Sequence, residues 1–289
     1  MQYAKPKIIA EIGCNHKGDV DLAKEFITIA KIYCKVDIVK FQKRNVAVWA
    51  ERYPQLYNAP HPNQTNAYGE TYREHREYLE FDLNQNREIK EFCETLGVVY
   101  STSVWDLISA QEIASLNPKL IKIPSACNTN IEMLTWLCDY YNGEIHISTG
   151  MTKNTEIEDI IELFIKKRRN KDLVLYNCTS GYPVPYKDVC LLEISKLKDK
   201  YGDIVKEIGF SGHHLGIGLD IAAYTLGASV IERHFTLDRT WKGTDHSASL
   251  EPEDMKTLVD NLQSVYEALN FKDEEILPIE EVQRKKLKW

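Results

Sequence analysis

The chain has 289 residues, of which 43% are hydrophobic and 27% are charged, which is typical of a globular protein with a sizeable core and excludes a disordered or collagenous chain. A formal net charge of −7 argues against a general affinity for nucleic acid or an anionic membrane, so basic residues are expected to act singly inside a pocket. At this length, one large domain competes with two small ones.

The cysteines and the N-terminus bear on the compartment. Seven cysteines are an odd number and include no Cys-x-x-Cys spacing, which favours reduced thiols in a cytoplasmic protein. Residues 1–13 lack the long apolar core of a signal peptide, and no window approaches the roughly 18 apolar residues of a membrane span. We therefore predict a soluble, cytoplasmic protein.

Short apolar runs recur along the chain, and a stretch with helical periodicity follows each of them. Asp19 is placed to cap a helix over 20–33, and Asn142-Gly143 to end one over 131–141. The alternation predicts a parallel sheet and favours a single-domain (β/α)8 barrel of the α/β class, with a doubly wound sheet left open because strand order cannot be read from one sequence. The eight predicted strands are 7–13, 37–43, 98–104, 120–126, 144–150, 172–178, 207–213 and 229–235.

Two segments do not follow this alternation. Residues 44–85 are too long for an ordinary connection and are rich in aromatic and polar residues, which is typical of a lid, a binding segment or a disordered excursion. Residues 271–289 carry Pro278 and a basic cluster and are interpreted as a tail. We therefore assign residues 1–270 to a barrel and 271–289 to a C-terminal tail.

Polar residues gather at the ends of the predicted strands, where a buried strand would not choose them for packing. In a barrel these ends converge on one mouth, which is where the active sites of this fold are built. The residues concerned are Glu11, Asn15, His16, Lys40, Gln42, Lys122, Ser125, Ser148, Thr149, Asn177, Thr179, Ser180, Ser211, His213, His214, Glu232, Arg233 and His234.

Two lysines and several hydroxyls among these residues suit a phosphate group. Lysine supplies a point charge and serine a directional donor, a pairing that fits an anionic ligand. The alternative is structural, with each lysine paired to a barrel glutamate and each serine capping a helix. The predicted cradle consists of Lys40, Lys122, Ser125, Ser148, Ser180 and Ser211.

His213 and His234 end neighbouring strands of the predicted barrel, so their imidazoles can share one divalent metal ion, which would act as a Lewis acid on a carbonyl oxygen. The alternative is a hydrogen-bonded core histidine. His214 is the weaker candidate, because neighbouring residues at a strand end point in opposite directions.

Three acids, Glu11, Glu232 and Asp245, can accept protons or hold substrate hydroxyls, although pairing with the cations of the mouth is a competing structural role. Two cysteines near the mouth, Cys127 and Cys178, are treated as packing residues.

Seven motifs, taken in order and at barrel spacing, resemble the sialic acid synthase family, the phosphoenolpyruvate-dependent synthases of N-acetylneuraminate and related nonulosonic acids. The similarity runs from about residue 7 to residue 270. Two segments, residues 232–252 and YGETYREHREYLEF (68–81), look most like the animal-type enzymes that act on a 6-phosphorylated sugar. The motifs are AEIGCNHKGD (10–19), VKFQK (39–43), KIPS (122–125), ISTGM (147–151), CTSGYP (178–183), GFSGHHLGI (209–217) and ERHFTLDRTWKGTDHSASLEP (232–252).

The resemblance implies a barrel enzyme that joins C3 of phosphoenolpyruvate to the aldehyde carbon of an open-chain aldose such as N-acetylmannosamine or its 6-phosphate, with water attacking C2 and phosphate leaving by C–O cleavage. It implies that the predicted cradle holds phosphoenolpyruvate, and that His213 and His234 bind Mn²⁺ or Mg²⁺. The implied catalytic residues are Glu11, Lys40 and His234, and the implied sugar contacts are Gln42, Tyr182, Glu232 and Asp245.

The chain departs from the family pattern in two places. Cys127 and Asn128 stand where the family usually has an acid after the KxxS motif. Family members also continue into a C-terminal antifreeze-like domain that reaches the partner subunit's site, whereas this sequence stops about where its linker would begin. The resemblance therefore implies a homodimer of barrels, with a separate protein as a possible source of the missing domain.

Three alternatives stay open from the residues. An octulosonate- or heptulosonate-type synthase would share the barrel and phosphoenolpyruvate. A Schiff-base aldolase would use Lys40 or Lys122 as its amine. A non-catalytic barrel would bind a sugar phosphate without turnover.

Overall fold

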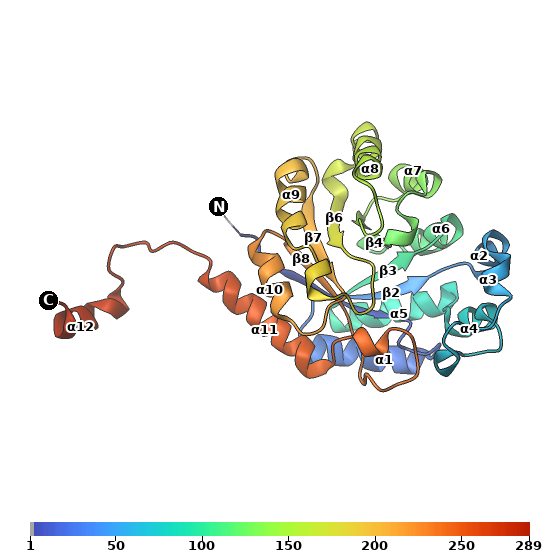
Figure 1. Ribbon diagram of the computed structural model, residues 1–289, viewed down its shortest axis with the longest axis horizontal. Helices are drawn as coiled ribbons and strands as arrows, with labels where there is room; N and C mark the ends of the chain where they lie inside the picture. Colours follow the sequence, from blue (N-terminus) through green and yellow to red (C-terminus); the bar gives the residue numbers. More distant parts are fainter. Residues whose placement is uncertain (1–2) are drawn as a thin grey trace.

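The computed structural model describes residues 3–289 and consists of eight parallel strands closed into a barrel, surrounded by helices (Figure 1). Each strand pairs with the next, and β1 pairs with β8, which closes the barrel and excludes the doubly wound sheet. The predicted (β/α)8 fold is thereby confirmed. The strands are β1 (Lys7–Gly13), β2 (Ile38–Lys43), β3 (Val99–Val104), β4 (Leu120–Ile123), β5 (Glu144–Ser148), β6 (Leu173–Cys178), β7 (Glu207–Gly212) and β8 (Val230–His234).

All eight predicted strands are present, but two of them end two or three residues earlier than predicted. β4 ends at Ile123 because Pro124 has no backbone N–H to continue the ladder, and the chain turns there into the 3₁₀ helix η3 (Ser125–Cys127). β5 ends at Ser148. Both early ends leave a serine of the predicted cradle at the rim of the barrel, where it is free to turn inward.

Helices cover the outside of the barrel and also extend over part of its mouth (Figure 1). The α-helices are α1 (Val20–Thr28), α2 (Val46–Arg52), α3 (Pro54–Tyr57), α4 (Tyr72–Leu79), α5 (Leu83–Leu96), α6 (Leu107–Ser115), α7 (Ile131–Tyr140), α8 (Asn154–Lys166), α9 (Leu192–Tyr201), α10 (Gly218–Thr225), α11 (Pro252–Ala268) and α12 (Pro278–Leu287). The short helices are the π-helix η1 (Ile29–Tyr33) and the 3₁₀ helices η2 (Gln64–Asn66), η4 (Asn170–Asp172), η5 (Tyr186–Asp188) and η6 (His246–Ala248).

Local capping explains where several of these helices begin. Asp19 caps α1 as predicted, its carboxylate accepting from the backbone N–H groups of Asp21 and Leu22. The single helix predicted over 20–33 is wrong in its second half, because the chain widens into η1 from Ile29 onward. α7 ends at Tyr140, close to the predicted Asn142-Gly143 stop.

The hydrophobic core lies mainly between the strands and the ring of helices. Phe26 on α1 and Phe164 on α8 are fully buried there. A smaller cluster fills the inside of the barrel with residues such as Ile9, Leu120 and Tyr176. Each buried side chain of this size contributes roughly 1.5–3 kcal/mol. The packed interior makes the barrel a rigid base for the side chains that follow it at the strand ends.

Residues 44–85 are more ordered than a loop of that length suggests. They form α2, α3, η2, α4 and the start of α5, and α4 begins with a capping box in which Thr71 and Glu74 exchange hydrogen bonds. His75, Arg76 and Leu79 of α4 are buried. The segment is therefore a helical cover packed on the barrel.

The tail after α11 is also partly helical. α12 begins at Pro278, and none of its residues is buried. Figure 1 shows this helix at the end of an extended segment that leads away from the barrel. None of the helices within residues 3–289 combines the length and the apolar character needed to span a bilayer. All seven cysteines are free thiols.

Candidate active site

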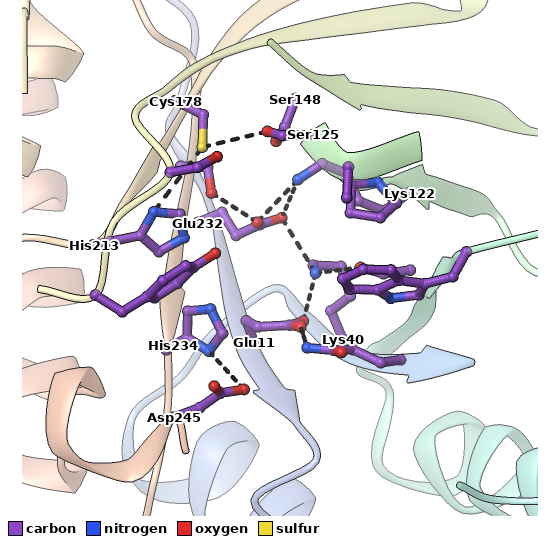
Figure 2. Close-up of a pocket in the computed structure, with 18 of the residues that line it drawn as sticks. Glu11, Lys40, Lys122, Ser125, Ser148, Cys178, His213, Glu232, His234 and Asp245 are labelled. Atoms are coloured by element: carbon purple, nitrogen blue, oxygen red, sulfur yellow. Dashed lines mark hydrogen bonds and ion pairs between the residues drawn. The ribbon is translucent and has the colours of Figure 1, made fainter. Parts of the chain in front are cut away.

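The strand ends surround one cavity of about 400 Å³ at the mouth of the barrel. Figure 2 shows side chains from the ends of several strands, among them Glu11, Lys122 and His234, pointing into it. Every residue that the resemblance assigned to catalysis, ligand binding or metal binding lines this cavity, so the structure gathers the whole predicted set. These residues are Glu11, Lys40, Gln42, Lys122, Ser125, Ser148, Ser180, Tyr182, Ser211, His213, Glu232, His234 and Asp245.

Two lysines and two glutamates form a buried network at the floor of the cavity (Figure 2). Lys40 Nζ lies 2.5 Å from Glu11 Oε2 and 3.7 Å from Glu232 Oε2, and it donates to Ser103 Oγ at 2.7 Å. Lys122 Nζ lies 2.9 and 3.0 Å from the two carboxylate oxygens of Glu232. The lysines thus make the ion pairs of the structural alternative and also face the cavity.

The pKa values of the two glutamates move in opposite directions. Burial is the largest influence on Glu11 and raises its pKa, although Lys40 and His234 favour the ionised form. Burial would also raise the pKa of Glu232, but Lys122 and Lys40 hold it well below its usual 4.5. Glu232 is therefore a fixed negative charge, whereas Glu11 can gain a proton more easily than an exposed glutamate.

The two lysines also differ. Burial opposes the charged form of Lys40, but Glu11 and Glu232 outweigh it and raise its pKa. Burial lowers the pKa of Lys122, and Lys40 adds to this effect while Glu232 opposes it. The ammonium of Lys122 also lies 4.3 Å from the ring centroid of Tyr176, which stabilises its charge. An anion that enters the cavity would stabilise both ammonium groups further.

The serines of the predicted cradle surround the same floor. Ser211 donates to Glu232 Oε1 at 3.0 Å, and Ser125 accepts from the backbone N–H of Gly150 at 3.0 Å. A Cβ atom at Gly150 would lie 2.4 Å from Ser180 Oγ and 2.7 Å from Ser125 Oγ, so the close approach of these hydroxyls requires a glycine. The hydroxyls and lysines together offer the donors that an anionic oxygen group needs.

The orientation of the Glu11 side chain depends on an irregularity in the pairing of strand β1. The pairing of β1 with β2 shifts between Glu11 and Gly13, and Gly13 has a φ of 58°, a conformation that favours glycine. Gln42 Nε2 donates to Glu11 Oε1 at 3.2 Å. A Cβ atom at Gly13 would lie 3.1 Å from that same amide nitrogen. Gly13 therefore makes room for the Gln42 side chain beside the carboxylate.

His213 and His234 face each other across the cavity with ring centroids 5.4 Å apart. His213 Nδ1 donates to the carbonyl oxygen of Thr179 at 3.0 Å, which leaves Nε2 as a free acceptor. Burial lowers the pKa of His213 to about 3, so its ring is neutral. His234 Nδ1 has no hydrogen-bond partner among residues 3–289 and lies 4.0 Å from Asp245 Oδ2.

Imidazole nitrogens without protein partners are the donor type that a divalent transition metal prefers, and within residues 3–289 this pair offers them, so it fits such an ion. Within residues 3–289, no group of three or more His, Cys, Asp or Glu side chains is arranged to hold a metal. An ion at the histidine pair would therefore complete its coordination with water or substrate oxygens. Asp245, whose pKa is lowered by His234 against the effect of burial, provides a nearby negative charge.

His214 lies outside the cavity, as the sequence indicated. It is fully buried beside Asp220 and Arg233, where Nε2 lies 3.3 Å from Asp220 Oδ2 and 3.2 Å from Arg233 Nη1. Arg233 also pairs with Asp220. This cluster joins β8 to α10, which explains why Arg233 follows Glu232 and yet points away from the mouth.

The two cysteines near the mouth behave differently from each other. Cys127 packs beside Trp105, and burial raises its pKa to about 12. Cys178 lines the cavity, where sequence analysis expected packing only, with Sγ 3.7 Å from Ser125 Oγ. Burial raises the pKa of Cys178 as well, so it is a thiol and a poor nucleophile.

Sequence reasoning missed several residues of the cavity wall. Arg44 lies two residues beyond Gln42, so the alternation along β2 could have identified it. Tyr72 and Arg76 come from α4, inside the segment expected to be a loop. The missed polar and aromatic wall residues are Arg44, Tyr72, Arg76, Ser103, Trp105 and Thr244.

A parallel barrel with a buried lysine–glutamate network, a carboxyl of raised pKa and a histidine pair at its mouth defines an enzyme of the (β/α)8-barrel class. The chain belongs to the NeuB family, whose sequence model matches residues 26–274. The resemblance to sialic acid synthases is thereby confirmed.

Named relatives agree over nearly the whole chain. The sequence is 38% identical over 280 residues to the N-acetylneuraminate-9-phosphate synthase of Homo sapiens, covering 97% of this chain and 76% of the relative. It is 35% identical to the N,N'-diacetyllegionaminic acid synthase of Campylobacter jejuni, covering 92% and 78%. The crystal structure of the sialic acid synthetase from Leptospira borgpetersenii superposes with a TM-score of 0.81 at 28% identity, covering 98% of this chain and 93% of that one.

Proposed function

We propose that this protein condenses phosphoenolpyruvate with an open-chain aldose such as N-acetylmannosamine or its 6-phosphate, giving a sialic-acid-like nonulosonic acid and inorganic phosphate. The observation that carries the proposal is the juxtaposition, in one cavity, of a buried lysine pair with a histidine pair in which His234 Nδ1 has no hydrogen-bond partner among residues 3–289. The first suits a phosphorylated anion and the second suits an aldehyde oxygen. The names of the relatives, which are synthases of nonulosonic acids, support the same reaction.

The lysine end of the cavity would bind phosphoenolpyruvate. Lys40 and Lys122 offer charge, and Ser125, Ser148, Ser180 and Ser211 offer hydroxyl donors around them. Glu232 holds both ammonium groups in place and keeps them protonated, which makes it a positioning residue as well as a possible sugar contact. Burial strengthens each of these interactions with the anion.

Glu11 is suited to both proton transfers of the reaction. C3 of phosphoenolpyruvate forms the new bond to the aldehyde carbon, and the aldehyde oxygen takes a proton as it becomes a hydroxyl. Water then adds to C2 and loses a proton, and the C2–O bond to phosphate breaks. Because burial raises the pKa of Glu11, its carboxyl can give the first proton and accept the second.

The histidine pair would hold Mn²⁺ or Mg²⁺, and such an ion, when bound, polarises the aldehyde oxygen. The other residues of this end would orient the sugar. Gln42, Tyr182 and Asp245 line the same cavity as the histidines and Glu11, and each carries a polar group that can meet a sugar hydroxyl.

The remaining features of the proposal concern the protein as a whole. The catalytic unit would be the barrel within residues 1–270, and the protein would act in the cytoplasm as a homodimer without binding nucleic acid or membrane. The net charge of −7 and the free thiols are compatible with this setting.

The test is phosphate release from phosphoenolpyruvate in the presence of Mn²⁺ and one aldose at a time. N-acetylmannosamine and its 6-phosphate should support turnover, whereas mannose and arabinose 5-phosphate should not. A preference for arabinose 5-phosphate would favour the octulosonate-type alternative. Borohydride trapping of a pyruvyl group on Lys40 or Lys122 would favour the aldolase, and the absence of phosphate release with every aldose would overturn the proposal.

A further inference from the structure

Tyr176 lies inside the barrel against one of the active-site lysines, and the proposed reaction gives it no role. It is fully buried on β6 within the smaller cluster that fills the barrel interior. The ammonium of Lys122 lies 4.3 Å from the centroid of its ring. Both side chains are buried, and a ring attracts a cation most strongly where water is excluded. Among the described residues Lys122 lines the cavity and Tyr176 does not, so Tyr176 can affect a ligand only through the lysine.

A chain of hydrogen bonds holds the hydroxyl of Tyr176. Nδ1 of His146 on β5 lies 2.6 Å from this hydroxyl, and Nε2 lies 3.3 Å from Glu144 Oε2. The hydrogen bond with His146 and the pairing with Lys206 lower the pKa of Glu144 to about 2, so its carboxylate is ionised and can only accept. Burial lowers the pKa of His146, so its ring is neutral and carries one proton. That proton lies on Nε2, and Nδ1 therefore accepts from the Tyr176 hydroxyl.

A glycine on the neighbouring strand makes room for the ring of Tyr176. Gly209 on β7 is the residue that pairs with Tyr176 in the sheet. A Cβ atom at Gly209 would lie 2.6 Å from both Cδ1 and Cε1 of the ring, so any other residue there would displace it. The ring is thus fixed at its hydroxyl by His146 and along one edge by the backbone of β7. It has lost its freedom of movement before any ligand binds.

Lys122 depends on this ring more than Lys40 would. Lys40 pairs with both glutamates of the network, whereas Lys122 pairs with Glu232 alone within residues 3–289. A lysine ammonium carries three N–H donors on a flexible stem, so its neighbours must set its position. Glu232 and the Tyr176 ring together define a position from which Lys122 still lines the cavity.

A residue that only fills space would not need these polar groups. The neighbours of Tyr176 in the barrel interior are apolar and include Ile9, Leu120 and Val230. A buried hydroxyl and a buried imidazole cost free energy unless each is hydrogen-bonded, and an apolar pair of the same volume would carry no such cost. The His146–Tyr176 pair is therefore expected to have a task besides packing, and the contact of the ring with Lys122 indicates which one.

We infer that Tyr176 is a positioning residue: Glu144 and His146 fix its ring, and the ring holds the ammonium of Lys122 where it meets the anionic part of phosphoenolpyruvate. The inference rests on the proposed function, because it takes the lysine end of the cavity as the phosphoenolpyruvate site. Tyr176 then acts on the affinity for this substrate and not on the chemical steps, since other residues transfer the protons and hold the metal. The affinity for the aldose, which the histidine end would bind, is independent of it.

The test measures kcat and the KM values for phosphoenolpyruvate and the aldose in variants of Tyr176 and His146. Tyr176→Leu removes the ring and should raise KM for phosphoenolpyruvate about 10- to 30-fold, as expected for the loss of a buried cation–π contact. Its kcat and its KM for the aldose should stay within about threefold of wild type, because the lost interaction is one of binding. Tyr176→Phe and His146→Leu keep the ring but remove its anchor, and each should raise KM for phosphoenolpyruvate about threefold. His146→Gln should recover wild-type KM, since its amide oxygen can accept from the Tyr176 hydroxyl.

The matched control is Tyr224→Leu. Tyr224 on α10 is also buried, and its hydroxyl also donates to a fixed acceptor, the carbonyl oxygen of Ala4 at 2.8 Å. Among the described residues it does not line the cavity. Its loss should lower the free energy of unfolding without changing either KM. The same result for Tyr176→Leu, with both KM values unchanged, would mean that Tyr176 only stabilises the fold and would overturn the inference.

Calorimetric titration with phosphoenolpyruvate alone separates the inference from the proposed function, because it needs neither an aldose nor turnover. A wild type that releases phosphate with an aldose, beside a Tyr176→Leu variant that binds phosphoenolpyruvate equally tightly, refutes the inference and leaves the function intact. A wild type that releases none with any aldose, beside a variant with at least about tenfold weaker binding, refutes the function and supports the positioning role. If Tyr176→Leu does not fold, Tyr176→Phe and the two His146 variants decide: unchanged affinity in Tyr176→Phe and His146→Leu counts against the inference.

Discussion

Replacing Glu232 with glutamine should destabilise the barrel more than any loss of a surface ion pair. The substitution keeps the size of the side chain but removes the negative charge that faces two buried ammonium groups. Lys122 Nζ lies 2.9 and 3.0 Å from the carboxylate oxygens, and Lys40 Nζ lies 3.7 Å from one of them. Lys40 keeps Glu11 as a partner, whereas Lys122 loses the only carboxylate with which it pairs within residues 3–289.

The size of the effect follows from what Lys122 can do in response. Removing one partner of a buried ion pair typically costs about 3–5 kcal/mol. The cost is bounded because Lys122 can release its proton instead. Its ordinary pKa is 10.5, about 3.5 units above pH 7, and about 1.36 kcal/mol per unit gives a limit of about 5 kcal/mol. We expect the free energy of unfolding to fall by about 3–5 kcal/mol at pH 7.

The pH dependence identifies the cause. In the variant the folded protein binds fewer protons at Lys122 than the unfolded chain does, so its stability should rise with pH between 7 and 10. The deficit relative to wild type should therefore shrink over this range. Urea unfolding followed by circular dichroism measures it, with Glu88→Gln as control, because Glu88 forms a solvent-exposed pair with Lys24 that contributes little to stability. A deficit no larger than that of the control, or one that grows with pH, would refute the reasoning.

Three further outcomes concern the catalytic groups. Glu11→Gln should lower kcat about 10²- to 10⁴-fold and remove the acidic limb of the kcat–pH profile. In wild type the midpoint of that limb should lie above the ordinary glutamate pKa of 4.5, because burial raises the pKa of Glu11. Chelation with EDTA should abolish phosphate release and Mn²⁺ should restore it in wild type but not in His234→Ala; full activity after exhaustive chelation would exclude the metal. Iodoacetamide at pH 7 should alkylate the exposed Cys190 and spare Cys178, because burial raises the pKa of Cys178. Activity should therefore persist. Loss of activity in parallel with labelling of Cys178, measured by peptide mass spectrometry, would contradict this.

The sequence was sufficient to predict the barrel and the location of the site because both depend on local pattern. Eight apolar runs of strand length, each followed by a helical period, allow few other arrangements. The polar residues at the ends of these runs then share one mouth whatever the details of packing. Lys40, Ser211 and His234 could be assigned to one cavity from this rule alone.

The pairing inside the cavity could not be predicted in the same way. Lys122 lies on β4 and Glu232 on β8, which are on opposite sides of the barrel. Their side chains meet because the tilt of the strands brings them to the same height along the barrel axis. Neither the hydrophobic periodicity nor the composition of the sequence predicts the position of a side chain along the barrel axis. The competing structural and ligand-binding interpretations of the lysines therefore had to stay open until the geometry was known.

Arg44 and Arg76 of the cavity wall were missed for a different reason. The length and polarity of residues 44–85 predict a long loop. α4 has too few apolar residues for hydrophobic periodicity to indicate a helix there. The spacing of Thr71 and Glu74 was nevertheless a capping-box signal, and the helix it starts carries Arg76 into the wall of the cavity. A short polar helix that packs on the barrel through buried charges can therefore be predicted from its N-terminal capping residues, but not from hydrophobic periodicity.

The arginines and the lysines of the cavity should respond differently to an anion, and this difference can be measured. Arg44 and Arg76 line the cavity, whereas their partner Glu80 does not, so an anion there adds to the existing pairs. At the lysine end Glu11 and Glu232 face the cavity themselves. Phosphoenolpyruvate bound there must raise the pKa of Glu11 further, because a second negative charge approaches a carboxyl whose pKa burial has already raised.

Binding of phosphoenolpyruvate near pH 6 should therefore be accompanied by proton uptake at Glu11, since the folded protein binds more protons in the complex than alone. Calorimetric titrations in buffers of different ionisation enthalpy give the number of protons exchanged. The ligand's own phosphate can release a proton among the lysines, so the informative quantity is the difference between wild type and Glu11→Gln, which removes only the protein's contribution. Equal proton exchange in the two proteins would mean that Glu11 keeps one protonation state throughout binding, which would contradict the expected proton uptake.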